Sequence, residues 1–254
     1  MNVRGSNTIG RAPASSMKLR VENLTKRFGG LQVFDGISFE VEPGNVVGVI
    51  GPNGAGKTTL INVICGMLSP SGGKVWLGDS DISGKPFHII SRRGLLRSFQ
   101  QTNTFRAASV EENLHRVHLF SRDRPGPEVN LDVLLEEFGL DRHVNDRSDT
   151  LPYGLQKMLG LLMALAPKPK FLLLDEPAAG LERKERTRVD RFVQHARDTL
   201  GCATVIVEHD MDLVRRLCPH ILVLEAGRLL AEGAPDDVLS RPEVMDAYLG
   251  ADAE

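Results

Sequence analysis

Two kinds of apolar segment alternate along this chain. Short continuous runs rich in Val, Ile and Leu predict strands that are buried on both faces of a sheet. These runs are residues 45–50, 171–175, 203–208 and 220–225. Longer segments with helical spacing of apolar positions lie between them, notably residues 57–68 and 183–200. The alternation predicts an α/β fold whose main sheet is mostly parallel.

Two regions depart from this alternation. Near the N-terminus, residues 17–24 and 37–43 alternate polar and apolar positions, which predicts a small antiparallel β part. Further along, residues 109–120 and 131–140 have the pattern of amphipathic helices, separated by a segment rich in helix breakers. We therefore expect one domain, residues 17–254, with a helical subdomain of about residues 100–165 inserted into its core.

The composition disfavours several classes of protein. A net charge of −2 over 254 residues argues against a surface that binds nucleic acid. The three cysteines have no C-x-x-C spacing, which favours reduced thiols in a cytosolic protein over disulfides or a zinc site. No apolar run approaches the roughly 18 residues that span a bilayer. Residues 1–16, rich in Ser, Gly, Asn and Arg, are predicted to form a disordered tail.

A glycine-rich turn follows the first buried strand. GPNGAGKT fits G-x-x-x-x-G-K-[ST] and leads into a helix, the context that separates a phosphate-binding loop from a chance match. Small residues leave inward-pointing N–H groups accessible to phosphate oxygens, and the helix start adds its positive dipole end. Lys57 would reach the β- and γ-phosphates of a nucleotide, and the Thr58 hydroxyl would bind Mg²⁺. The predicted ATP-binding residues are Gly51, Pro52, Asn53, Gly54, Ala55, Gly56, Lys57, Thr58 and Thr59.

The apolar run at residues 171–175 ends in two adjacent carboxylates, Asp175 and Glu176. A strand buried on both faces does not normally end in two charges without a use for them. With the phosphate loop upstream, Asp175 is placed to hold Mg²⁺ through its hydration shell, and Glu176 to polarise the attacking water. A strand end that simply reaches solvent before Pro177 is the alternative, and it stays open for Glu176 alone.

The phosphate loop, LPYGLQ and LLLDEP, in that order, resemble the ATP-binding subunit of an ABC transporter, from about Met17 to Leu249. The resemblance implies a P-loop NTPase core, ATP and Mg²⁺ as ligands, and ATP hydrolysis coupled to transport. It also implies three further site residues. Gln100 in FQQ matches the glutamine that touches the metal and the water, and His209 in VEHD matches the switch histidine. Phe28 in KRFGG occupies the aromatic position that stacks on adenine, although it would also suit a core.

The segment LPYGLQK lies where the family has its signature, Leu-Ser-Gly-Gly-Gln or a variant. The resemblance implies that Leu151, Pro152, Tyr153, Gly154 and Gln156 act in trans, on the ATP of a second ATPase subunit in a head-to-tail dimer. Leu151, Gly154 and Gln156 are taken to keep the pattern. Pro152 replaces a serine whose hydroxyl caps the helix and bonds to the γ-phosphate. We expect the helix to survive, because proline fits a first helical turn, and the partner's site to lose one contact.

Four short segments, PYG, AAGL, VEHDMDLV and EVMDAYLG, resemble the ATPases of branched-chain amino-acid importers. This resemblance implies a peripheral subunit at the cytoplasmic face of the inner (plasma) membrane. Its partners would be a second, different ATPase chain, two membrane permease subunits and, indirectly, a periplasmic binding protein.

Other functions remain as alternatives. Urea-importer and lipopolysaccharide-export ATPases belong to the same group. A regulatory subunit with weakened ATPase activity stays open because of Pro152. A soluble ATPase of this type that acts on nucleic acid or the ribosome is disfavoured, because the chain has one cassette and a net charge of −2.

Overall fold

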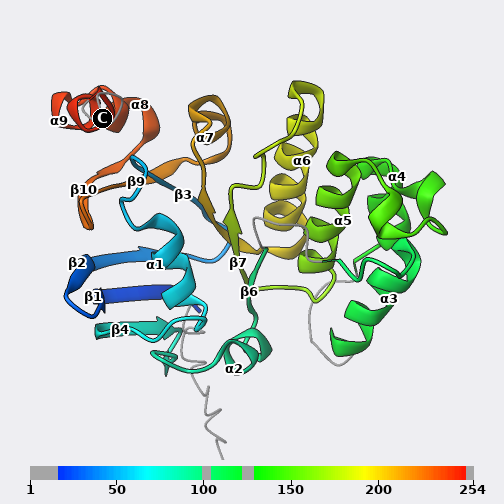
Figure 1. Cartoon of the computed structure of the whole chain (residues 1–254), viewed down its shortest axis with the longest axis horizontal. Helices are drawn as coiled ribbons and strands as arrows, with labels where there is room; N and C mark the ends of the chain where they lie inside the picture. Colours follow the sequence, from blue (N-terminus) through cyan, green and yellow to red (C-terminus); the bar gives the residue numbers. More distant parts are fainter. Residues whose placement is uncertain (1–16, 99–103, 122–128, 250–254) are drawn as a thin grey trace, which may run out of the picture.

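Two β-sheets form the framework of the protein (Figure 1). The computed structural model describes residues 17–98, 104–121 and 129–249. In the larger sheet, only β10 pairs in antiparallel fashion, with β9, and the other pairings are parallel. This sheet has the order β10 (Arg228–Gly233), β9 (His220–Glu225), β3 (Val46–Ile50), β8 (Ala203–Val207), β7 (Phe171–Asp175) and β6 (Leu95–Arg97).

The smaller sheet is antiparallel and lies near the N-terminus of the described chain. Its strands follow the order β2 (Leu31–Val41), β1 (Leu19–Phe28), β4 (Gly72–Leu77) and β5 (Ser80–Asp81). The predicted α/β fold, with a mostly parallel sheet and a small antiparallel β part, is therefore confirmed.

Helices flank the larger sheet, and three of them, α3, α4 and α5, gather on one side of the molecule (Figure 1). They supply the predicted helical region, while the bounds of about 100–165 remain a prediction because residues 99–103 and 122–128 lie outside the described residues. The helices are α1 (Lys57–Ile64), α2 (Phe87–Arg92), α3 (Val110–Ser121), α4 (Leu131–Phe138), α5 (Tyr153–Leu165), α6 (Arg183–Leu200), α7 (Met211–Leu217), α8 (Pro235–Leu239) and α9 (Pro242–Leu249).

Helix α1 is shorter than its apolar pattern predicts. The pattern continues to residue 68, but the helix ends at Ile64. Gly66 follows with a φ of 77°, and a Cβ there would lie 2.1 Å from the carbonyl oxygen of Lys85. This close approach requires a glycine with left-handed backbone dihedral angles, and a residue in that conformation ends an α-helix.

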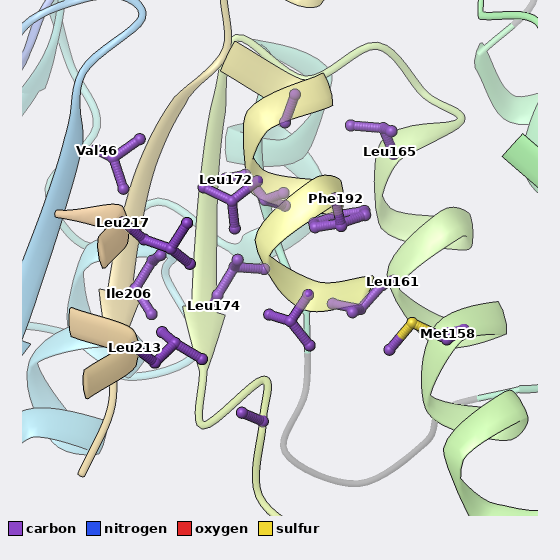
Figure 2. Close-up of a cluster of buried hydrophobic side chains, with 14 of the residues drawn as sticks. Val46, Met158, Leu161, Leu165, Leu172, Leu174, Phe192, Ile206, Leu213 and Leu217 are labelled. Carbon is purple, nitrogen blue, oxygen red and sulfur yellow. The ribbon is translucent and has the colours of Figure 1, made fainter. Parts of the chain in front are cut away.

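The larger apolar cluster joins α5 to the sheet. Met158 and Leu161 of α5, Phe192 of α6, and Leu172 and Leu174 of β7 belong to it (Figure 2). These five side chains are at most 3% exposed, and burying a side chain of this size stabilises a fold by about 1.5–3 kcal/mol. Helix α5 is therefore packed firmly against the rest of the protein, as its almost entirely apolar sequence predicts.

The three cysteines, Cys65, Cys202 and Cys218, are free and buried. Burial raises the pKa of Cys202 and that of Cys218 to about 12 each. Along the described stretches, none of the helices has the length and apolar character to cross a membrane. The predicted disordered tail, residues 1–16, lies outside the described residues.

Candidate functional site

The glycine-rich loop between β3 and α1 closes around the side chain of Lys57. Its Nζ donates hydrogen bonds to the carbonyl oxygens of Gly51, at 2.7 Å, and Pro52, at 2.8 Å. Burial lowers the pKa of Lys57, and the nearby carboxylates of Glu176 and Asp175 oppose this shift. The ammonium is thus held at the loop, beside the helix start where phosphate oxygens bind.

Glycines make this close packing possible. Gly51 has a φ of 147°, and a Cβ there would lie 2.0 Å from the carbonyl oxygen of Leu224 on β9. Gly56 precedes α1 with a φ of 96° and gives the helix no side-chain cap. The first N–H groups of α1 therefore make no hydrogen bond to an N-cap side chain, and an anion can bind them.

Asp175, at the end of β7, has its two oxygens in different environments. Oδ1 lies 3.4 Å from Oγ1 of Thr58, whose hydroxyl donates to it. Oδ2 accepts a hydrogen bond from Nη2 of Arg97 at 2.8 Å, and Nη1 of the same arginine contacts Asn62. The Asp175 side chain is 1% exposed and that of Arg97 is 5% exposed. A hydroxyl beside one fixed carboxylate oxygen is the ligand chemistry that Mg²⁺ prefers, so these residues fit the predicted metal.

Glu176 and His209 meet beside the phosphate loop. Nε2 of His209, just after β8, lies 3.0 Å from Oε1 of Glu176. Glu176 has a φ of 47°, a left-handed conformation that is uncommon for a residue other than glycine. Both side chains line one pocket with the loop. The pocket residues are Val33, Asn53, Gly54, Gly56, Lys57, Thr58, Thr59, Glu176 and His209.

Not every predicted residue lines this pocket. Ala55, a residue of the loop itself, is 2% exposed and packs among buried apolar side chains. Phe28 is 46% exposed at the end of β1, and Nζ of Lys26 lies 4.6 Å from the centre of its ring. Phe28 is not among the residues that line the pocket, so adenine stacking stays a prediction. Gln100 lies outside the described residues.

The predicted signature residues form the turn that enters α5. Leu151 is buried, and Pro152 takes the N-cap position, with no side-chain hydrogen bond to the helix. The helix survives the proline, as predicted. Tyr153 is 49% exposed, and its ring lies over Gly180, where an added Cβ would approach Cε1 of the ring to 2.8 Å.

Gln156 does not occupy the glutamine position of the signature. Counted from Leu151, the fifth position of Leu-Ser-Gly-Gly-Gln is Leu155, which is 8% exposed. Gln156 follows one residue later, and its Nε2 donates to the carbonyl oxygen of Leu151 at 2.8 Å. The expectation that Gln156 keeps the family's pattern is therefore wrong in register, and its amide closes the turn internally.

Gly154 lets the starts of α5 and α6 pack closely. Glu182 is the N-cap of α6 and forms a reciprocal capping box with Glu185. A Cβ on Gly154 would lie 2.0 Å from Oε1 of Glu185. The missing side chain at position 154 thus makes room for the cap of the neighbouring helix.

Sequence reasoning missed several buried charges behind the site. Arg97, Lys157 and Glu208 are each at most 8% exposed. Each of them has a partner at least 19 residues away in the sequence, which leaves no local motif to find. A usable signal existed only for Lys157, a lone cation that enters an otherwise apolar helix.

The site combines a phosphate loop with a buried aspartate and a glutamate–histidine pair at one end of a mostly parallel sheet. With the helical region beside it, this arrangement is that of an ATP-binding cassette ATPase. The sequence profile of the family described as ABC transporter matches residues 34–179. A second profile, described as branched-chain amino acid ATP-binding cassette transporter, matches residues 228–254.

Whole proteins are similar as well. The high-affinity branched-chain amino acid transport ATP-binding protein BraF of Pseudomonas aeruginosa is 38% identical, over 91% of this chain and 97% of BraF. The lipopolysaccharide export system ATP-binding protein LptB of Escherichia coli K12 is 35% identical, over 92% of this chain and 98% of LptB. The crystal structure of MJ1267, an ATP-binding cassette of an ABC transporter in its ADP conformation, superposes with a TM-score of 0.79 at 31% identity, covering 92% of this chain and 99% of MJ1267. The chain belongs to the ABC transporter family, as an ATP-binding and ATP-hydrolysing cassette.

Proposed function

We propose that this protein powers an importer of branched-chain amino acids by binding and hydrolysing ATP. The observation that carries the solute class is the 38% identity to BraF over 91% of the chain, together with the C-terminal profile match at residues 228–254. The ATPase machinery, from the phosphate loop to His209, would serve any solute equally well, because it does not touch the transported molecule.

At the site, the loop would wrap the phosphates of ATP and Lys57 would contact the β- and γ-phosphates. Glu176 would orient and polarise the attacking water, with His209 holding its carboxylate from 3.0 Å away. Thr58 and Asp175, together with Gln100, would hold Mg²⁺, which neutralises phosphate charge when it is bound. Phe28 would stack on the adenine.

The signature turn would act on a second ATPase chain. In a head-to-tail dimer, the turn from Leu151 to Gly154 would face the partner's γ-phosphate with the N-terminus of α5 behind it. Pro152 brings no hydroxyl to this contact, so the chemistry at Lys57 and Glu176 would be the stronger of the two sites if the partner has a serine there. The dimer would sit peripherally at the cytoplasmic face of the inner membrane, on two permease subunits fed by a periplasmic binding protein.

Two other functions are favoured by particular observations. The 35% identity to LptB, nearly as high as that to BraF, favours lipopolysaccharide export as the second candidate for the cargo. The uncapped start of α5 at Pro152 favours a regulatory subunit that binds ATP and hydrolyses it weakly. Co-purification of the permease subunits, followed by solute binding to the cognate periplasmic protein, separates the cargoes.

Replacement of Glu176 tests the proposed chemistry. In Glu176→Gln, we expect steady-state phosphate release to fall by about 10²–10⁴-fold, the usual contribution of a general base. The affinity for ATP should stay within about twofold, because the amide keeps the shape of the side chain and the phosphate loop is untouched. Turnover near the wild-type rate would remove Glu176 from the role of base. If the wild-type protein itself hydrolyses ATP as slowly as a variant without a base should, the result would instead support a regulatory subunit.

A further inference from the structure

Lys157 is a lysine buried inside the protein. It lies on α5, in the second turn after the signature, and is 5% exposed. Lysine is almost never buried this deeply without partners. Its Nζ donates to two main-chain carbonyl oxygens, those of Glu176 and Ala179, at 2.8 Å each. Burial lowers the pKa of Lys157, and the carboxylates of Glu208, Glu176 and Asp175 oppose this shift.

Those two carbonyls belong to the turn that carries the proposed base. The Glu176 N–H donates to the carbonyl of Val207 at 2.9 Å, and the Ala179 N–H donates to the carbonyl of Glu176 at 3.2 Å. Glu176 itself is left-handed, with a φ of 47°. Such a conformation is strained in a residue other than glycine and persists only when the surroundings fix it. The ammonium of Lys157 binds both ends of the turn and is one of the groups that fix it.

Glu208 holds the same turn from the other side. It is 4% exposed. One of its oxygens accepts from the N–H of Ala178 at 2.8 Å, and the other accepts from the N–H of His209 at 3.1 Å. The turn is therefore held from two sides. Lys157 connects it to α5, the signature helix, and Glu208 connects it to the segment that carries His209.

We propose that Lys157 is a positioning residue that sets the main chain of Glu176, and thereby the carboxylate facing His209, and that couples this carboxylate to the signature helix. The inference rests on the proposed role of Glu176. It gives a direct physical route between the two ATP sites of a dimer, because α5 begins at the turn that faces the partner's nucleotide, whereas Glu176 faces this chain's own. A shift of α5 would move the main chain of Glu176 through the side chain of Lys157.

The test compares five single variants of the purified full chain. Lys157→Met removes the ammonium and keeps the apolar length of the side chain, while Lys157→Arg restores a cation that can donate to both carbonyls. Lys157→Gln serves if the methionine variant does not fold. Lys74→Met, at an exposed position of β4, makes the same chemical change away from the site. Steady-state phosphate release, ATP affinity and thermal unfolding are measured for each, with Glu176→Gln in the same assay.

We expect kcat of Lys157→Met to fall by roughly tenfold to a hundredfold, since a small misplacement of a catalytic group has effects of this size. Its ATP affinity should stay within twofold, Lys157→Arg should recover most of kcat, and Lys74→Met should match the wild type. An unchanged kcat in folded Lys157→Met, or a loss confined to ATP affinity, would overturn the inference. If Glu176→Gln hydrolyses ATP at the wild-type rate, the proposed role of Glu176 fails instead. This result distinguishes a failure of the proposed base from a failure of Lys157 as its positioning residue.

Discussion

The pocket beside the phosphate loop and the signature turn differ in where their hydrogen bonds lie. At the pocket and just behind it, the groups that would hold a nucleotide or its Mg²⁺ are themselves bonded to the protein: Lys57 to two carbonyls, Asp175 to Arg97 and Glu176 to His209. At the signature turn, the exposed tip at Pro152 makes no side-chain bond to its helix. The turn is held from behind instead, by the amide of Gln156 and by the packing of α5.

This difference suggests two kinds of preorganisation. The pocket fixes individual side chains before ATP arrives, so losing one of them should have a local and large effect. The signature turn fixes the direction of a whole helix, so changes at its tip should have small effects on stability and should be felt only where a second subunit supplies the nucleotide. Substitutions in the two regions can break or sharpen this comparison.

The largest effect on stability is expected at Arg97, behind the pocket. In Arg97→Met the Asp175 carboxylate stays buried without its cation, which costs about 3–5 kcal/mol of unfolding free energy when one partner of a buried pair is removed. Urea denaturation measures the change, and Arg92→Met on the exposed side of α2 is the matched control.

A double variant isolates the pair. Combining Arg97→Met with Asp175→Asn removes both charges and should recover part of the lost stability. A loss below about 1 kcal/mol in the single variant would mean that Asp175 does not depend on Arg97, and the pocket would then be less preorganised than its geometry indicates.

The next effect is expected at Lys57, inside the pocket. Lys57→Ala removes a charge-assisted contact with the phosphates, worth about 1.5–3 kcal/mol, or roughly a tenfold to hundredfold loss of ATP affinity. A titration with labelled ATP measures it, with thermal unfolding as the check that the loop still folds. Unchanged affinity would count against the phosphate loop as the binding site.

The smallest effect is expected at the signature tip. Pro152→Ser gains a helix cap worth about 1 kcal/mol but loses the stiffness of proline, so stability should change by less than about 0.5 kcal/mol. In a complex whose Lys57 site is disabled, turnover at the partner's site should rise about two- to fivefold through the added hydrogen bond. The same rate before and after the change would show that the tip does not limit that site.

The sequence predicts the pocket far better than its support. Gly51 to Thr58 form a contiguous motif between a buried strand and a helix, and Asp175 and Glu176 end an apolar run, so local pattern is enough. Arg97 and Asp175 are 78 residues apart, and a sequence gives no sign of such a pair until the strands are placed side by side.

In the signature region, the sequence predicts the location of the motif but not its exact register. Its motif is recognisable, but one substituted position was enough to shift the apparent glutamine from Leu155 to Gln156. Counting from Leu151 places Leu155 at the glutamine position, and in the structure the Gln156 amide bonds back to the Leu151 carbonyl. The role of Lys157 depends on a turn 19 and more residues away, and the pattern of the helix shows only that a cation there needs a partner.

The burial of the three native cysteines has a practical consequence. The thiolate is the form that reacts with maleimides and iodoacetamides, and burial raises the pKa of Cys202 and Cys218 to about 12 and also raises that of Cys65. A single cysteine introduced on the surface would therefore react first in the folded protein, without a cysteine-free background. Paired fluorophores or spin labels at such positions would report the approach of two cassettes in real time, in a chain whose native sequence is otherwise intact.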